Sequence, residues 1–163
     1  MNKILPVLLL SLLPSLSFAG GDHGSHDDGK ESSVGLPGHS TDVSRTVEVE
    51  MGDNMRFSPS QINVKAGETI RFSVENAGQL QHELVIGNTE ELHEHAQMMR
   101  KMPDMQHQED NMVSLKGGQK DDLIWKFDQA GSVDFACLRP GHWEAGMKGE
   151  VEVEVKNFKR ACK

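Results

Sequence analysis

A short stretch near the end of the chain, DFACLRPGHWEAGMKGEVEVEV (134–155), contains three side chains that can bind a metal ion. Cys137, His142 and Met147 follow one another at intervals of five residues, with a proline and two glycines between them. Thiolate and thioether sulfurs are soft donors, and together with imidazole they select copper. Proline and glycine favour tight turns, which would bring the three donors together. The stretch therefore predicts a copper-binding loop.

A copper site of the electron-transfer type has two histidines, one cysteine and a weak axial methionine, so a second histidine is needed. His82 is the best candidate, because it opens the strand-like segment HELVIG after a polar turn. The histidines of residues 20–44 have no strand to hold them. His93, His95 and His107 lie in a segment that looks helical.

Two other interpretations of the loop stay open. Zinc is less suitable, because zinc sites are built from cysteine, histidine and carboxylate donors rather than methionine. Without a metal, Cys137 would be a buried thiol, His142 a surface imidazole and Met147 a core side chain. The regular spacing and the presence of His82 favour copper.

Alternating apolar and polar residues predict the strands that must position these donors. The alternating runs are 47–51, 70–74, 123–127, 133–137 and 151–155. Turn sequences separate them, and many short strands predict a β-sandwich or barrel. One domain is therefore expected in residues 45–156, followed by a basic tail, 157–163. Cys162 lies in this tail and is not expected to pair with Cys137.

One segment, about 89–110, interrupts the strands. Asn88 and Glu91 form a capping-box pattern, and TEELHEHAQMMRKM then predicts a helix that stops at Pro103. Its expected inner face carries Leu92, His95, Met98, Met99 and Met102. Candidate donors for a secondary Cu(I) site are His93, His95, Met98, Met99, Met102, Met105 and His107. Ordinary packing is the alternative, because methionine fills irregular gaps in cores.

Residues 1–19 have the features of a secretory signal peptide. Lys3 precedes an apolar run, and Ser17, Phe18 and Ala19 form a small-x-small cleavage pattern. We predict cleavage after Ala19 and export of the mature chain.

Residues 20–44 are rich in glycine, serine, aspartate and histidine and have few large apolar side chains. Such a segment cannot bury enough surface to order itself, which predicts a flexible arm. The arm carries His23, His26 and His39, which either belong to a solvated linker or bind Cu(II) loosely.

The 163-residue chain has a formal net charge of −8. An acidic surface disfavours nucleic acid and anionic membranes as partners, and it suits cations or a basic protein. After signal cleavage we expect no membrane span and a monomer.

The stretches NVKAGETIRF, HELVIG and FACLRPGHWEAGMKGEVEV resemble the cupredoxins, and the resemblance covers most of residues 45–156. It implies an all-β, Greek-key sandwich of the plastocyanin/azurin type, with the short helical segment as an insert. It also implies a type 1 copper centre with copper as a Cu+/Cu2+ cofactor, held by His82, Cys137, His142 and Met147. The insert and the histidine-rich leader are similar to those of periplasmic cupredoxins linked to copper tolerance.

From this resemblance we expect periplasmic copper handling, with a redox or copper-trafficking protein as partner. The alternative is an electron shuttle to a periplasmic reductase or terminal oxidase. An enzyme is not expected. Related copper enzymes carry histidines beside the type 1 cysteine, where this chain has Ala136 and Leu138.

Overall fold

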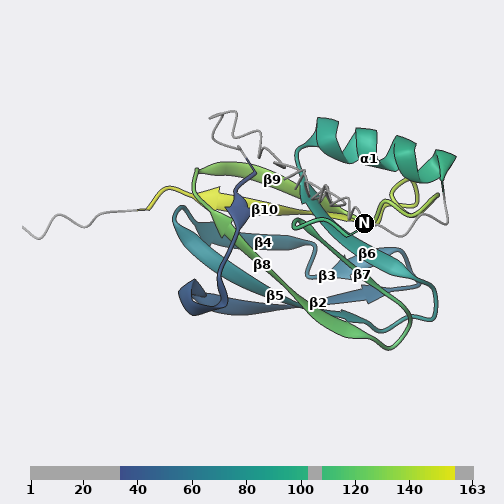
Figure 1. The fold of residues 1–163 in the computed structure, drawn as a ribbon, viewed down its shortest axis with the longest axis horizontal. Helices are drawn as coiled ribbons and strands as arrows, with labels where there is room; N and C mark the ends of the chain where they lie inside the picture. The colour runs from purple at the N-terminus through teal and green to yellow at the C-terminus, as the bar shows by residue number, and fades with distance from the viewer. Residues whose placement is uncertain (1–33, 103–107, 157–163) are drawn as a thin grey trace, which may run out of the picture. The chain divides into compact units, whose positions relative to one another are not determined.

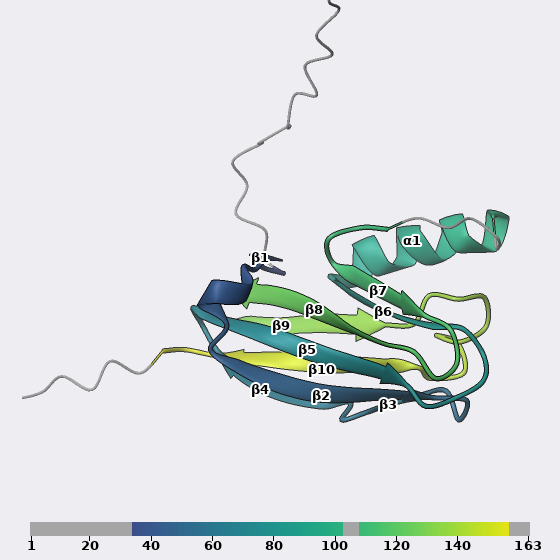
Figure 2. The ribbon, with the colours of Figure 1, turned by 60° about the horizontal axis from the view of Figure 1, so that its bottom comes forward.

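The computed structural model describes residues 34–102 and 108–156. Within these ranges, ten strands form two five-stranded sheets that pack face to face (Figure 1, Figure 2). The first sheet contains, in spatial order, β1 Leu36–Pro37, β8 Lys120–Phe127, β5 Glu68–Asn76, β2 Arg45–Gly52 and β3 Arg56–Ser58. The second contains β4 Gln61–Lys65, β10 Lys148–Glu154, β9 Gly131–Ala136, β6 His82–Gly87 and β7 Met112–Leu115. The predicted all-β sandwich is confirmed.

The core lies between the sheets and contains the inward-facing residue of each alternating pair. Phe72 and Trp125 come from the first sheet, and Leu84 and Val151 from the second; all four are buried in one cluster. The β2–β5 and β4–β10 pairs are parallel and the others antiparallel. Neighbouring strands are mostly not consecutive in the chain, so the connections cross between the sheets and bring distant segments to one end of the sandwich.

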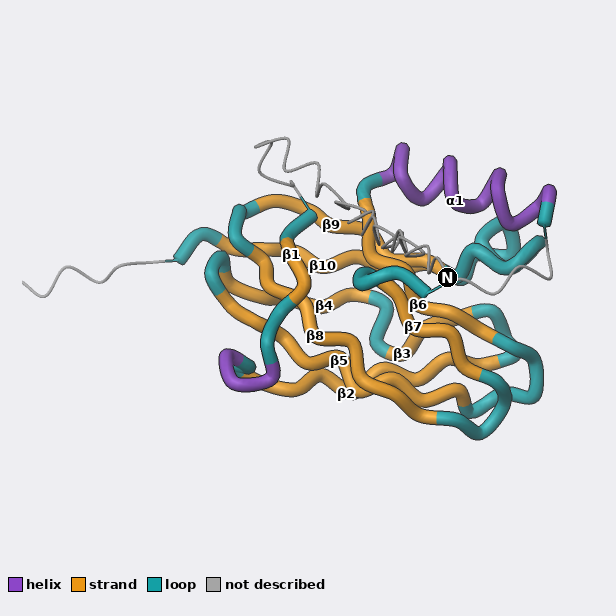
Figure 3. The backbone as a smooth tube through the Cα atoms, viewed as in Figure 1, coloured by secondary structure: helices purple, strands orange, loops and turns teal. Residues whose placement is uncertain are grey.

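The helix α1, Thr89–Lys101, lies outside the sandwich beside β6 and β9 (Figure 3). The predicted capping box is present: the Asn88 side chain accepts from the Glu90 and Glu91 N–H groups, and Glu91 Oε2 accepts from the Asn88 N–H at 2.9 Å. Leu92 and Ala96 pack with residues of β6, β7 and β9 in a second apolar cluster. This cover explains why every residue of β6 is buried rather than every second one. Among the described residues, no helix is long and apolar enough to cross a membrane.

The boundary predicted at residue 44 differs from the structure. Val34 is buried in the main core, and its carbonyl accepts a hydrogen bond from Trp125 Nε1 at 2.7 Å. Strand β1 then pairs with β8, and a 3-10 turn, η1 Ser40–Asp42, leads into β2. The polar composition of this segment concealed a single apolar anchor and backbone pairing to an edge strand. Residues 20–33 of the predicted arm lie outside the described residues.

Candidate metal centre

The loop between β9 and β10 is closed by its own backbone hydrogen bonds. The Cys137 N–H donates to the Met147 carbonyl, the Met147 N–H to the His142 carbonyl and the His142 N–H to the Arg139 carbonyl, each at 3.0 Å. Gly141 and Gly146 have positive φ angles of 86° and 101°, which glycine adopts without strain. These bonds bring the backbone of Cys137, His142 and Met147 together within one closed loop.

The second histidine reaches the loop from β6. His82 is the first residue of this strand and is completely buried. Strand β6 pairs with β9 in the same sheet, with Val85 opposite Ala136. Because the two strands are antiparallel, the beginning of β6 lies beside the residue that follows β9, which is Cys137.

Three donor atoms converge at this point. His82 Nδ1 lies 3.2 Å from His142 Nδ1, and Cys137 Sγ lies 3.3 Å from the same nitrogen. Among the described residues, these side chains form the one group of three or more His, Cys, Asp or Glu ligands whose donor atoms all lie within 4.8 Å of one another. Bonds of about 2.0–2.3 Å to one metal require donors about 3.5 Å apart, so only a small expansion is needed. Met147 is also fully buried and belongs to the same core cluster as Cys137.

Burial sets the protonation states of two of these groups. It raises the pKa of the Cys137 thiol to about 12, although hydrogen bonds from the Glu83 and Arg139 backbone act in the opposite direction. Burial, followed by the proximity of His82, lowers the pKa of His142. A neutral thiol and a neutral imidazole therefore face each other near pH 7, and a metal must displace the thiol proton.

Two acidic residues next to the donors were not predicted. Asp53, in the turn after β2, lies 3.1 Å from His82 Nε2 through its Oδ1 atom. Hydrogen bonds from the Gln79 backbone and from His82 lower the pKa of Asp53. Its sequence context, GDNM, resembles an ordinary turn and contains no signal of this contact.

Glu83 is the second of these acids and is buried beside His82 on β6. Its N–H donates to Cys137 Sγ at 3.4 Å, and its Oε1 accepts from the Leu138 N–H at 3.2 Å. Glu83 therefore connects β6 both to the cysteine side chain and to the backbone of the next residue, Leu138. A charged residue inside the apolar run HELVIG was the available signal.

Helix α1 contacts the outer side of the same loop. The rings of His93 and Trp143 have centroids 4.6 Å apart, and Arg100 Nη1 lies 2.7 Å from Glu144 Oε1. His93, one of the predicted secondary donors, thus takes part in a ring contact with the residue that follows His142.

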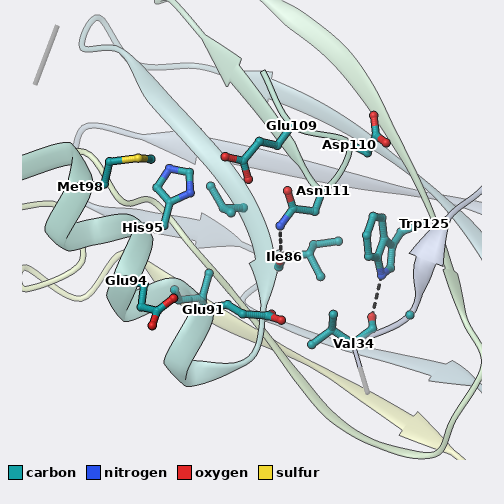
Figure 4. A pocket seen from close by; sticks show the side chains of 13 residues that line it. Val34, Ile86, Glu91, Glu94, His95, Met98, Glu109, Asp110, Asn111 and Trp125 are labelled. Atoms are coloured by element: carbon teal, nitrogen blue, oxygen red, sulfur yellow. Dashed lines mark hydrogen bonds between the residues drawn. The ribbon is translucent and has the colours of Figure 1, made fainter. Parts of the chain in front are cut away.

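The other predicted secondary donors are separated. His95 and Met98 line one cavity of about 540 Å³ next to Glu94 and Glu109 (Figure 4). Met99 lines a different cavity, and Met102 is exposed. The histidine of the 34–44 segment, His39, is exposed as well. Three predicted histidines and one methionine lie outside the described residues: His23, His26, His107 and Met105.

Replacing Met147 by leucine is expected to keep the copper chromophore and raise the reduction potential. In a copper site with these donors, the Met147 thioether would be the weak ligand that stabilises Cu(II), and the strong bonds would come from the two histidines and the cysteine. Because leucine has a similar volume, the free energy of unfolding should fall by less than about 1.5 kcal/mol. Absorption spectra and redox titration measure the two effects. Met51→Leu, in the same core, is the control and should leave the potential unchanged; loss of the visible band in Met147→Leu would contradict this role.

Comparison with protein families matches residues 43–154 to the copper-binding proteins of the plastocyanin/azurin family. A protein of Rubrivivax gelatinosus named copper-resistant cuproprotein CopI is 46% identical over 93% of this chain and 98% of its own length. A protein of the same name from Pseudomonas aeruginosa is 33% identical over 94% of this chain and 98% of its own.

Solved structures share the fold at lower identity. Auracyanin B superimposes with a TM-score of 0.60 and 19% identity, over 77% of this chain and 97% of its own. Auracyanin from Roseiflexus castenholzii has a TM-score of 0.58 and 22% identity, over 71% of this chain and 99% of its own.

Proposed function

Since this chain belongs to the plastocyanin/azurin family of copper-binding proteins, we propose that it holds one redox-active type 1 copper for copper handling in the periplasm. The proposed ligands are His82, Cys137, His142 and Met147. The observation that supports them most is the convergence of His82 Nδ1, Cys137 Sγ and His142 Nδ1 at the closed end of the β9–β10 loop. The predicted copper cofactor is confirmed by the family and agrees with the chemistry of these donors.

The protein's own contribution is to hold the donors in place and exclude water. Copper supplies one-electron chemistry when bound. His82, Cys137 and Met147 are fully buried, so solvent does not compete for their positions. His142 is half-buried and is the one ligand near the surface, where a partner protein would exchange electrons or copper. Four protein donors leave no position for a substrate, which supports a binding protein rather than an enzyme.

Copper handling is favoured over a plain electron shuttle by two features. Relatives that share most of their length with this chain are named copper-resistant cuproproteins. The insert also adds imidazole and thioether donors outside the type 1 site. We propose that the protein works as a monomer and that its partner is a redox or copper-trafficking protein of the same compartment.

The proposal is tested by a strain that lacks the gene and is sensitive to copper. Wild-type protein should restore growth on copper, and His142→Ala should not, because it removes a ligand at the surface of the site. Purified wild-type protein should bind more than one copper. Two results together would favour the electron shuttle instead. The purified protein would bind one copper per chain, and the protein would restore respiration to the strain without restoring its copper tolerance.

A secondary copper site is proposed at His95 and Met98. The two residues are one helical turn apart and line the same cavity, with carboxylates from Glu94 and Glu109 (Figure 4). Imidazole and thioether together suit Cu(I).

Met98→Leu is therefore expected to lower the total Cu(I) bound by one equivalent while the Cys137 chromophore stays intact. Leucine keeps the volume and removes the soft sulfur. Anaerobic competition titration measures the count. Met99→Leu is the matched control, because this neighbouring methionine lines the other cavity. An unchanged count in Met98→Leu would leave simple packing as the role of this face.

The mature protein is expected to begin at Gly20, because the leader ends in the small-x-small pattern at Ala19. Mass spectrometry of natively produced protein from a periplasmic extract checks this. An intact Met1 in that extract would contradict export through a cleaved leader.

A further inference from the structure

The inner histidine of the site is held on its far side by an acidic side chain from another turn. His82 has no exposed surface, so its Nε2 atom does not face bulk solvent. The partner within reach is Asp53 Oδ1, at 3.1 Å. An ionised carboxylate can only accept hydrogen bonds, so the proton of this bond lies on His82 Nε2.

The carboxylate itself is fixed by a second turn. Gln79 N–H donates to Asp53 Oδ2 at 2.9 Å, and Leu80 N–H donates to Oδ1 at 3.2 Å. Gly78 approaches so closely that a Cβ atom there would lie 2.1 Å from Asp53 Oδ1. Asp53 is thus oriented independently of the histidine, from a turn 26 residues further along the chain.

A buried side-chain amide stabilises that second turn. Asn76 is fully buried, and its Nδ2 donates to the Leu80 and Leu115 carbonyls at 2.8 and 2.9 Å. Its Oδ1 accepts from the Gly78 N–H at 3.0 Å. Two strand ends therefore hold the turn, and the turn holds the carboxylate that bonds to His82.

We propose that Asp53 is the positioning residue of the copper centre: its carboxylate keeps His82 as the Nε2–H tautomer and directs the Nδ1 lone pair at the metal. The inference rests on the proposed copper site. Since His82 Nδ1 then carries no proton, it accepts the hydrogen bond from His142 Nδ1 in the copper-free protein. The negative charge of the Asp53 carboxylate, which accepts the hydrogen bond from Nε2–H, also makes the imidazole a stronger donor, and a stronger donor stabilises Cu(II) more than Cu(I).

The first test uses copper-free protein, so it does not depend on metal loading. Proton–nitrogen correlation spectra of the imidazole rings should show His82 as the Nε2–H tautomer, with a slowly exchanging proton. In Asp53→Ala, the buried Nε2 loses its acceptor, and a mixture of tautomers is expected. A pure Nε2–H tautomer in the variant would overturn the proposal.

The second test measures copper. Asp53→Ala should weaken Cu(II) binding about 10–100-fold, the usual effect of removing a partner behind a metal ligand. Asp53→Asn keeps an acceptor for Nε2 but removes the charge, so it should weaken binding less and raise the reduction potential. Glu152→Gln, an exposed acid on β10, is the control for loss of charge alone and should do neither.

Gly78→Ala provides a variant that keeps the carboxylate but displaces it, and it should resemble Asp53→Ala in affinity and tautomer. It also keeps the proposal testable should Asp53→Ala fail to fold. Wild-type affinity and potential in both Asp53→Asn and Gly78→Ala would refute the role of Asp53. If wild-type protein shows no thiolate–copper band at all, the copper site itself is wrong, and the two failures are thereby distinguished.

Discussion

Cys137→Ser is expected to abolish the intense visible absorption of the copper-loaded protein. That absorption requires charge transfer from a thiolate to Cu(II), and Cys137 is the one cysteine among the described residues. A serine hydroxyl has a similar size but is not a soft donor and stays protonated near neutral pH. Absorption and electron paramagnetic resonance spectra of the two proteins at equal copper content measure the change.

His82→Ala should give the same loss, because it removes the buried nitrogen 3.2 Å from His142 Nδ1. Met112→Leu is a suitable control, since this buried methionine of β7 belongs to the second apolar cluster. It should leave the spectrum unchanged. An intense band that persists in either ligand variant would mean that the ligand assignment is incorrect.

Copper affinity is expected to rise about tenfold for each unit of pH between 6 and 8, so about 100-fold over that range. Burial raises the pKa of Cys137 to about 12 in the copper-free protein, so the thiol is protonated throughout this range. The bound form is a thiolate, and one proton must leave for each copper ion. Raising the pH removes the released proton and therefore favours binding.

His142 adds nothing to this slope at neutral pH. Its pKa is lowered by burial and by His82, so the ring is already neutral above that pKa. Below it, copper must displace a second proton, and the dependence on pH becomes steeper. Calorimetry in buffers with different ionisation enthalpies should give one proton released per copper near pH 7. Release of no proton would show that Cys137 is already a thiolate and that burial does not raise its pKa above neutral pH.

The sequence alone determined the parts of this protein that depend on local spacing. Cys137, His142 and Met147 lie within one loop, so tight turns suffice to bring them together. Alternating residues identified the faces of the strands, and Asn88 with Glu91 identified the start of α1, because each pattern repeats over a few residues. The family follows from these same short stretches.

Tertiary structure decided the features that depend on distant segments. Asp53 and Gln79 are 26 residues apart and meet because the ends of β2 and β5 lie together. Helix α1 packs over the outer face of β6, so both faces of this strand are buried, and Glu83 is buried with them.

Two other predictions differ from the structure for the same reason. The helical face was expected either to carry one set of donors or simply to pack against the sandwich, and the structure directs His95 and Met98 to one cavity and Met99 to another. The arm was expected to extend to residue 44, but Val34 is anchored by Trp125, which lies 91 residues away. Contacts of this kind depend on which strands become neighbours in space, and no periodic pattern in the chain records that choice.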